Sequence, residues 1–218
     1  MVVQRYRSPV LAQITTLLLT GGEIHDSRGC GDEIEEALRG AGNFDVTRVH
    51  DGLSVLEAPN LDPFDVVVFY WTRGDITDMQ RDGLLNWIAS GKGFAGIHSA
   101  TASFRECPEY HSMLGGIFTT HPPPRKYRVS IVDPEHPITK GMREFFVEDE
   151  QYIMDYDPRV NVLASALWEG EEIPVVWTKS WAEGRVFYLA LGHDPEACRN
   201  ENFKMLLERG TLWAAGRQ

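Results

Sequence analysis

The feature that most constrains this chain is a series of short apolar segments that alternate with helical patterns along its first half. Asp65–Trp71 is almost wholly apolar, and Ile14–Thr20 and Phe94–His98 are similar. Between them, Glu33–Leu38 and Thr77–Ser90 carry apolar residues at the spacing of one helix face. Continuous apolar strands indicate a sheet covered on both faces. Their alternation with helices predicts an α/β fold with a parallel, doubly wound sheet.

The second half of the chain instead carries closely spaced strand-like segments. We predict a hairpin turn at Glu183-Gly184 and a closing amphipathic helix over Asn202–Ala215. No repeat or linker divides the chain, so we expect residues 1–13 to form an N-terminal tail and residues 14–218 a single domain. The predicted strands of this half are Lys126–Val132, Phe145–Tyr156, Val160–Ala166, Ile173–Trp181 and Arg185–Leu191.

The charge balance limits the partners of the chain. Asp and Glu number 32 against 21 Lys and Arg, which gives a formal net charge of −11. Such a chain offers no basic footprint to nucleic acid or to an anionic membrane. Its longest apolar run, Val66 to Trp71, is far shorter than the ~20 residues that span a bilayer. We therefore expect a small-molecule partner, neutral or cationic.

The cysteines indicate a compartment. Cys30, Cys107 and Cys198 are odd in number and lack CxxC spacing, which argues against a disulfide framework and for a reducing environment. The first residues only loosely resemble a signal peptide, and we interpret them as a short tail that enters a strand. We expect a cytoplasmic protein.

Polar residues follow several of the apolar strands. His25 follows the first strand, Trp71 ends the third, His98-Ser99 ends the fourth and His193 follows the last. In open α/β sheets, ligands bind beyond the carboxyl ends of the parallel strands. We therefore expect these side chains to meet at one rim, where Trp71 could stack on the apolar face of a sugar ring.

The segment Gly96–Ala100 has the pattern of a nucleophile elbow, a strand followed by a sharp turn of small residues and a helix. The residue at its apex is His98, whose imidazole can act as a base, a metal ligand or a weak nucleophile. Ser99 lies one residue past the apex, and we rank it second.

Two further clusters carry polar residues suited to a site. His121 follows a glycine pair and precedes a proline-rich loop, and Glu150 and Tyr152 lie in an acidic stretch that enters a strand. Imidazole and carboxylate are ligands that zinc and similar divalent ions take from proteins, although HExxH or CxxC regularity is absent. Each histidine has a structural alternative, and Asp149 and Glu150 could instead form a solvated strand edge.

Several of these segments, in their order along the chain, carry a family resemblance. They are Gly96–Ala100, Gly115–Pro122, His136-Pro137-Ile138, Asp149–Tyr152, Pro174–Trp177 and Gly184–His193. With them the chain resembles the ThuA-like (trehalose utilisation) family over about residues 14–216. That family belongs to the class I glutamine amidotransferase-like superfamily, which implies a flavodoxin-like three-layer α/β/α sandwich with a mostly parallel central sheet.

The departures from the superfamily are informative. Glutamine amidotransferases place a cysteine at the elbow apex, which is His98 here, and their catalytic histidine lies in an HPE motif that resembles His193-Asp194-Pro195-Glu196 with one residue inserted. No cysteine replaces the missing thiol, so the resemblance implies that glutamine hydrolysis through a thioester is absent.

The leading hypothesis is a carbohydrate-utilisation protein that acts on trehalose or a related, including oxidised, glycoside through acid/base chemistry by imidazole or metal-bound water. The alternatives are a non-catalytic sugar-binding or regulatory module and a metal-dependent hydrolase of another small molecule. The exposed strands of the second half offer an edge that a second copy could cover in a homo-oligomer. The predicted residues are His98, His193 and Glu150 for catalysis, His98, His121 and His193 for a divalent metal such as zinc, and His25, Trp71, Ser99 and Tyr152 for substrate.

Overall fold

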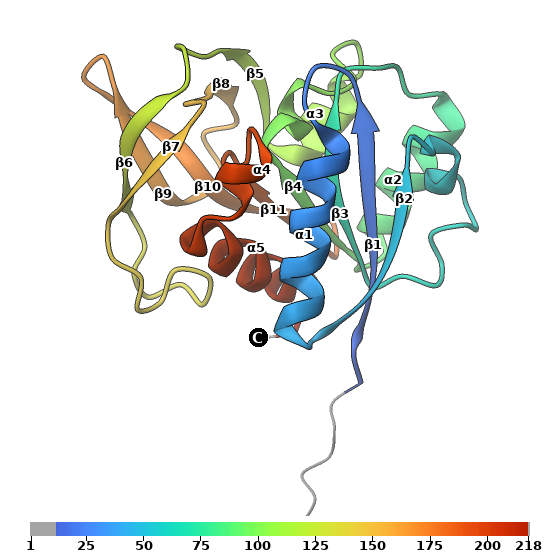
Figure 1. Ribbon diagram of the computed structural model, residues 1–218. Helices are drawn as coiled ribbons and strands as arrows, with labels where there is room; N and C mark the ends of the chain where they lie inside the picture. Colours follow the sequence, from blue (N-terminus) through green and yellow to red (C-terminus); the bar gives the residue numbers. More distant parts are fainter. Residues whose placement is uncertain (1–11, 218) are drawn as a thin grey trace, which may run out of the picture.

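The computed structural model describes residues 12–217, and within them the dominant element is a nine-stranded sheet in the order β2-β1-β3-β4-β11-β10-β9-β6-β7 (Figure 1). The first five strands in this order are parallel. Their arrangement is the flavodoxin-like order 2-1-3-4-5. These strands are β1 (Ile14–Gly22), β2 (Phe44–His50), β3 (Val66–Thr72), β4 (Gly93–Ile97) and β11 (Gly184–Leu189).

The other half of the sheet is antiparallel. β10 (Glu171–Trp181) pairs with β11 through the predicted hairpin and with β9 (Asn161–Trp168), and β6 (Arg125–Ile131) then joins β9 to the edge strand β7 (Phe145–Asp149). A separate two-stranded ribbon forms from β5 (Gly116–Thr120) and β8 (Ile153–Tyr156).

Helices cover both faces of the sheet, which produces the three layers. In Figure 1, α1, α4 and α5 lie in front of the sheet, and α2 and α3 lie behind it. β3 is buried along its whole length, as expected of a strand between two helical layers. The helices are α1 (Ser27–Ala41), α2 (Asp78–Ala89), α3 (Pro108–Leu114), α4 (Pro195–Cys198) and α5 (Glu201–Ala214), with 3₁₀ turns η1 (Leu53–Leu56) and η2 (His98–Ala102).

One predicted strand is wrong in a way that matters for the site. Phe145–Tyr156 is not one strand but two, β7 and β8, which belong to different sheets. The strand breaks because the buried residues at the break make other contacts: the Asp149 carboxylate accepts hydrogen bonds from the backbone of Gly192 and His193. The chain therefore leaves the large sheet at Glu150 and crosses over the ends of the parallel strands.

Two further observations concern the chain as a whole. Among residues 12–217, no helix is both long and apolar enough to cross a lipid bilayer. The predicted tail, residues 1–13, lies outside the described residues as far as residue 11, and the assignment of residues 14–218 to a single domain stays a prediction.

Candidate metal and substrate site

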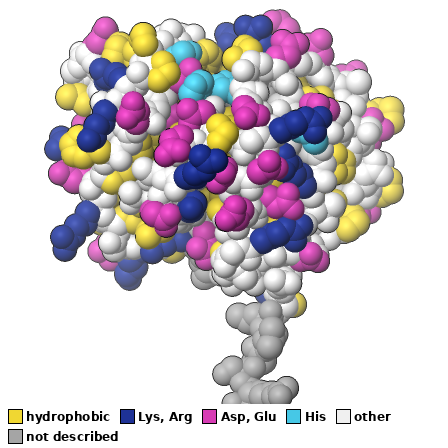
Figure 2. Space-filling model, viewed as in Figure 1, with side chains coloured by type: hydrophobic (Ala, Val, Ile, Leu, Met, Phe, Trp, Pro, Cys, Tyr) yellow, Lys and Arg dark blue, Asp and Glu magenta, His cyan; other side chains and the backbone are white. Residues whose placement is uncertain are grey.

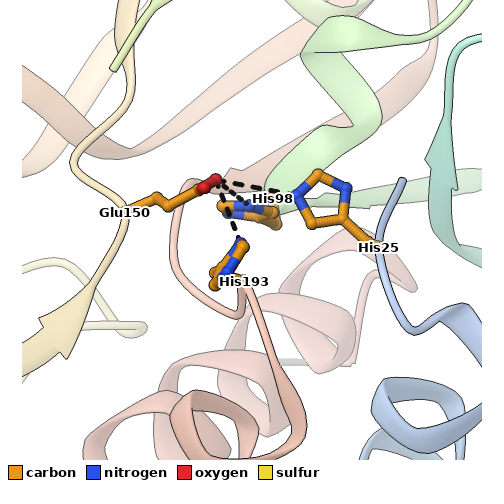
Figure 3. A group of neighbouring side chains, drawn as sticks. All are labelled: His25, His98, Glu150 and His193. Carbon is orange, nitrogen blue, oxygen red and sulfur yellow. Dashed lines mark ion pairs between the residues drawn. The ribbon is translucent and has the colours of Figure 1, made fainter. Parts of the chain in front are cut away.

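Four polar side chains converge beyond the carboxyl ends of the parallel strands. His25 follows β1, His98 follows β4, His193 follows β11, and Glu150 follows β7 on the segment that crosses over them (Figure 3). Parallel strands end at one edge of a sheet, so residues far apart in the sequence meet there. Figure 2 shows a group of histidine side chains at this upper end of the molecule.

One carboxylate oxygen lies at the centre of the cluster. Glu150 Oε2 lies 3.1 Å from His193 Nδ1, 3.4 Å from His98 Nε2 and 3.6 Å from His25 Nε2. The ligand atoms of all four residues lie within 4.8 Å of one another. The Glu150 and His25 side chains are buried and that of His98 is fully so, which leaves His193 as the partly exposed member.

The backbone explains how His98 reaches this position. The residue has a φ of 45°, in the left-handed region that non-glycine residues rarely occupy. This strained turn between β4 and η2 is the predicted elbow, and the Tyr188 hydroxyl holds it by donating to the His98 carbonyl at 2.6 Å. His98 Nδ1 lies 2.7 Å from the carbonyl oxygen of Ala190, which can only accept, so Nδ1 carries the proton.

His98 therefore presents a lone pair to the cluster. Burial lowers the pKa of His98 to about 4, despite the opposing effect of the neighbouring Glu150 carboxylate. The imidazole is neutral at physiological pH, and with its proton on Nδ1 its Nε2 atom is an acceptor directed at a carboxylate.

His25 is oriented in the same way by a hydroxyl relay. The Thr72 hydroxyl donates to Ser99 Oγ at 2.8 Å, so it accepts from His25 Nδ1 at 2.7 Å. This leaves the lone pair of His25 Nε2 facing Glu150. Ser99 is fully buried and acts on the site through Thr72. Thr72, the polar residue at the end of β3, was not predicted from the sequence. Its position at the end of a strand is the same signal that identified His25, His98 and His193.

Glu150 and His193 carry complementary pKa shifts. Burial by itself would raise the pKa of Glu150, but the close contacts with the His193, His25 and His98 imidazoles outweigh it and hold that pKa well below its usual range. The hydrogen bond with Glu150 raises the pKa of His193, against the opposing effect of burial. The pair therefore favours the protonated form of His193 beside the ionised Glu150 carboxylate.

The donor set fits a divalent transition metal. Tetrahedral coordination with bonds of about 2.0–2.1 Å separates ligand atoms by about 3.3 Å, close to the three distances measured from Glu150 Oε2. His98 Nε2 and His193 Nδ1 are buried and lack a well-aligned hydrogen-bond partner. Ligating imidazoles usually donate their other N–H to a carbonyl or carboxylate, as His98 does to Ala190.

A cavity of about 570 Å³ opens beside the cluster. The rings of Phe118 and Tyr152 lie 4.4 Å apart in its wall. His121 follows β5 at the rim, with Nδ1 2.8 Å from the carbonyl oxygen of Pro122 and Nε2 3.5 Å from Glu150 Oε1. Its place is therefore on the far side of the carboxylate from the other three imidazoles. The remaining lining residues include Ile24, Thr72, Arg73, Gly74, Asp75, Ala102, Arg105 and Glu106.

The structure brings together most of the predicted site residues, with several differences in placement. His25, predicted to contact substrate, lies among the atoms that could ligate a metal, whereas His121, predicted as a ligand, lies outside that group. Trp71 does not line the cavity, because strand alternation places it on the face of Phe69, where the two rings stack 6.3 Å apart. Tyr70, on the opposite face, is the residue that lies beneath the site.

Comparison with known proteins places this architecture. The family model described as ThuA, trehalose utilisation, matches residues 15–214. The chain belongs to the ThuA family. No curated protein matches it. Many solved structures resemble this ThuA-family chain, among them two ThuA-like proteins and a cytoplasmic protein.

A ThuA-like protein from Parabacteroides merdae has a TM-score of 0.85 at 23% identity, with 94% of this chain and 90% of that chain covered. A ThuA-like protein from Bacteroides uniformis has a TM-score of 0.80 at 20% identity, covering 97% and 95%. A cytoplasmic protein from Salmonella typhimurium has a TM-score of 0.68 at 17% identity, covering 92% and 99%. These likenesses establish the fold, and the chemistry must be argued from the site.

Proposed function

We propose that this ThuA-family protein binds a divalent transition-metal ion through His25, His98, His193 and Glu150, and acts on a carbohydrate in the adjacent cavity. The observation that carries the proposal is the direction of the imidazole lone pairs. His25 and His98 each have the proton fixed on Nδ1, so both direct Nε2 lone pairs at an anionic oxygen. Lone pairs and a carboxylate oxygen that face one another at 3.4–3.6 Å repel, and a cation bound between them would remove this repulsion.

The donor set also narrows the ion. Three imidazoles favour zinc, iron, nickel or copper over magnesium or calcium. Four protein ligands fill a tetrahedral site, whereas an ion that accepts five or six ligands keeps positions for substrate oxygens. Such an ion supplies Lewis-acid polarisation of a hydroxyl or carbonyl group.

The cavity supports a polyhydroxylated substrate. Its volume falls within the range of small-molecule sites. Tyr152 and Phe118 supply ring faces for the C–H side of a sugar, and polar groups surround them. His121 holds its Nδ1 proton on the Pro122 carbonyl, so Nε2 is free to accept a proton from a substrate hydroxyl at the rim. Trehalose or a related glycoside is the substrate class that the family description suggests.

Glutamine hydrolysis is not part of the proposed function, because the elbow carries an imidazole that cannot form a thioester. The described cysteines are free and buried, and none occupies the apex. Free thiols also support a cytoplasmic location, and the Salmonella typhimurium protein that shares this fold is itself a cytoplasmic protein.

The first test is elemental analysis of the purified protein, followed by chelation and titration with zinc, manganese, iron(II) and nickel. We expect one ion per chain and loss of binding in His98→Ala. A panel of trehalose, other disaccharides and their oxidised forms is then assayed by product formation and by thermal shift. Sugar-induced shifts without product would identify a binding module instead, and a chain that takes up no metal would refute the metal site.

A further inference from the structure

Asp149 is a buried carboxylate that touches no side chain of the cluster, yet it contacts the backbone of two of its members. Its side chain accepts from the N–H groups of Glu150 at 2.8 Å, Gly192 at 2.7 Å and His193 at 3.1 Å. The residue is 3% exposed. A buried carboxylate with three amide donors is well satisfied, and it joins the end of β7 to the loop after β11.

The arrangement of these bonds is specific. One oxygen, Oδ1, accepts from both Glu150 and His193, the two cluster members whose side chains lie closest to each other, at 3.1 Å. The other oxygen, Oδ2, accepts a hydrogen bond from the Gly192 N–H. The backbone segments that carry Glu150 and His193 are thus hydrogen-bonded to the same oxygen atom, although they lie more than forty residues apart in the chain.

Side chains hold much of the backbone before His193. Residues 190–192 lie outside any strand or helix, and although the Ala190 N–H donates to the Val175 carbonyl, other buried backbone groups of this loop are paired with side chains. Asp149 accepts from the N–H groups of Gly192 and His193, and the Tyr70 hydroxyl donates to the carbonyls of the same two residues, at 2.9 Å for Gly192 and 3.3 Å for His193. Gly192 has a φ of 106°, a conformation that favours glycine and turns His193 toward Glu150.

We infer that Asp149 is the positioning residue of the site, which sets the spacing of Glu150 and His193 by binding the backbone of both and thereby determines metal affinity and coordination geometry. This inference rests on the proposed metal-binding function. The carboxylate does not touch the ion or the substrate. It acts through the two ligands.

The substitution Asp149→Asn tests this directly, because an amide keeps the size but places an N–H₂ group against a backbone N–H. The matched control is Asp155→Asn, an exposed aspartate on β8. With fold checked by circular dichroism, we expect the cobalt(II) dissociation constant of Asp149→Asn to rise by about 10–100-fold, as for residues that orient metal ligands. We also expect an altered cobalt absorption spectrum, which a loss of stability alone would not produce. Asp155→Asn should match the wild type in both.

A second measurement needs no variant and no metal. In the wild-type chain the amide protons of Gly192 and His193 should exchange with solvent slowly, at rates similar to those of the adjacent strand β11. Rapid exchange of both amides would overturn the inference, as would a folded Asp149→Asn with wild-type cobalt affinity and spectrum. If the wild type binds no metal but these amides are protected, the proposed function fails, whereas the role of Asp149 in fixing the backbone of Gly192 and His193 is supported.

Discussion

Replacing Glu150 with glutamine removes the atom on which the whole cluster converges. The change keeps the side-chain shape but exchanges an anionic oxygen, which lies 3.1–3.6 Å from three imidazole nitrogens, for a neutral amide. The matched control is Glu148→Gln, which removes the same charge from an exposed position on the preceding strand, β7. Any effect of net charge alone will therefore appear in both variants.

The expected magnitude follows from linkage between binding and unfolding. At a free metal concentration 100 times the dissociation constant, the ion stabilises the wild type by about 2.7 kcal/mol. For a domain of this size that corresponds to a rise in Tm of about 5–11 °C. Loss of a ligand should weaken binding by about 100-fold or more, since residues that only orient ligands already cost 10–100-fold. At the same metal concentration Glu150→Gln would then gain only about 0.4 kcal/mol.

The assay is differential scanning calorimetry of chelated and metal-loaded protein for the wild type and both variants. We expect the metal-induced rise in Tm to be nearly abolished in Glu150→Gln and retained in Glu148→Gln. Should Glu150→Gln show the same rise as the wild type, Glu150 would not be a ligand, and the argument from converging lone pairs would fail.

Four further predictions address pH, packing and proton transfer. Metal affinity should fall as pH drops below the raised pKa of His193, because protons compete with the metal ion for the imidazole nitrogen. Calorimetric titrations at pH 6 and 8 measure this change in affinity. Titrations in buffers of different ionisation enthalpy should also show that metal binding releases protons. In the chelated protein, the stabilisation from the Glu150–His193 pair should be present below the ordinary histidine pKa and lost as pH rises through the raised pKa, a trend that urea titrations should find absent from Glu150→Gln. Gly192→Ala should destabilise the fold by about 1–3 kcal/mol in urea, because the residue has a φ of 106° and its Cβ would lie 2.8 Å from Phe203 Cε2. His121→Asn should lower turnover while metal affinity stays within about twofold of the wild type, and an equal loss of both would place His121 among the ligands.

Much of the site followed from one rule about strand ends. His98 comes directly after an apolar strand, and His25 and His193 follow theirs by a few residues; parallel strands end at the same edge, so the convergence of the three was predictable without coordinates. The rule works because the strands are buried on both faces, which fixes their direction and leaves few alternative arrangements. The rule does not give the orientation of the side chains at the edge of the sheet, and therefore it could not predict which histidine lies nearest Glu150.

The placement of His121 and Trp71 shows where that rule stops. His121 follows β5, a strand of the separate two-stranded ribbon, so its position depends on how the ribbon packs over the sheet and not on any sequence periodicity. Trp71 does lie at a strand end, but alternation assigns it to one face and Tyr70 to the other. The sequence pattern shows that neighbouring residues of β3 point to opposite faces of the sheet, but it does not show which face lies toward the site. Whether Tyr70 or Trp71 lies near the site therefore could not be decided from the sequence.

The broken strand at Asp149-Glu150-Gln151 carries a more general argument. All three residues are buried, and a strand that continued through them would need hydrogen-bond partners for polar side chains on both of its faces. Each instead has a partner outside the strand: Asp149 binds the His193 loop, Glu150 faces the imidazoles, and Gln151 accepts from Arg125. The same chemistry that ends β7 thus builds the candidate site, because the groups that end the strand pairing are those that contact the His193 loop and its imidazole. A run of consecutive acids and amides inside an otherwise apolar strand pattern should accordingly be interpreted as a crossing point over a site and not as a solvated edge.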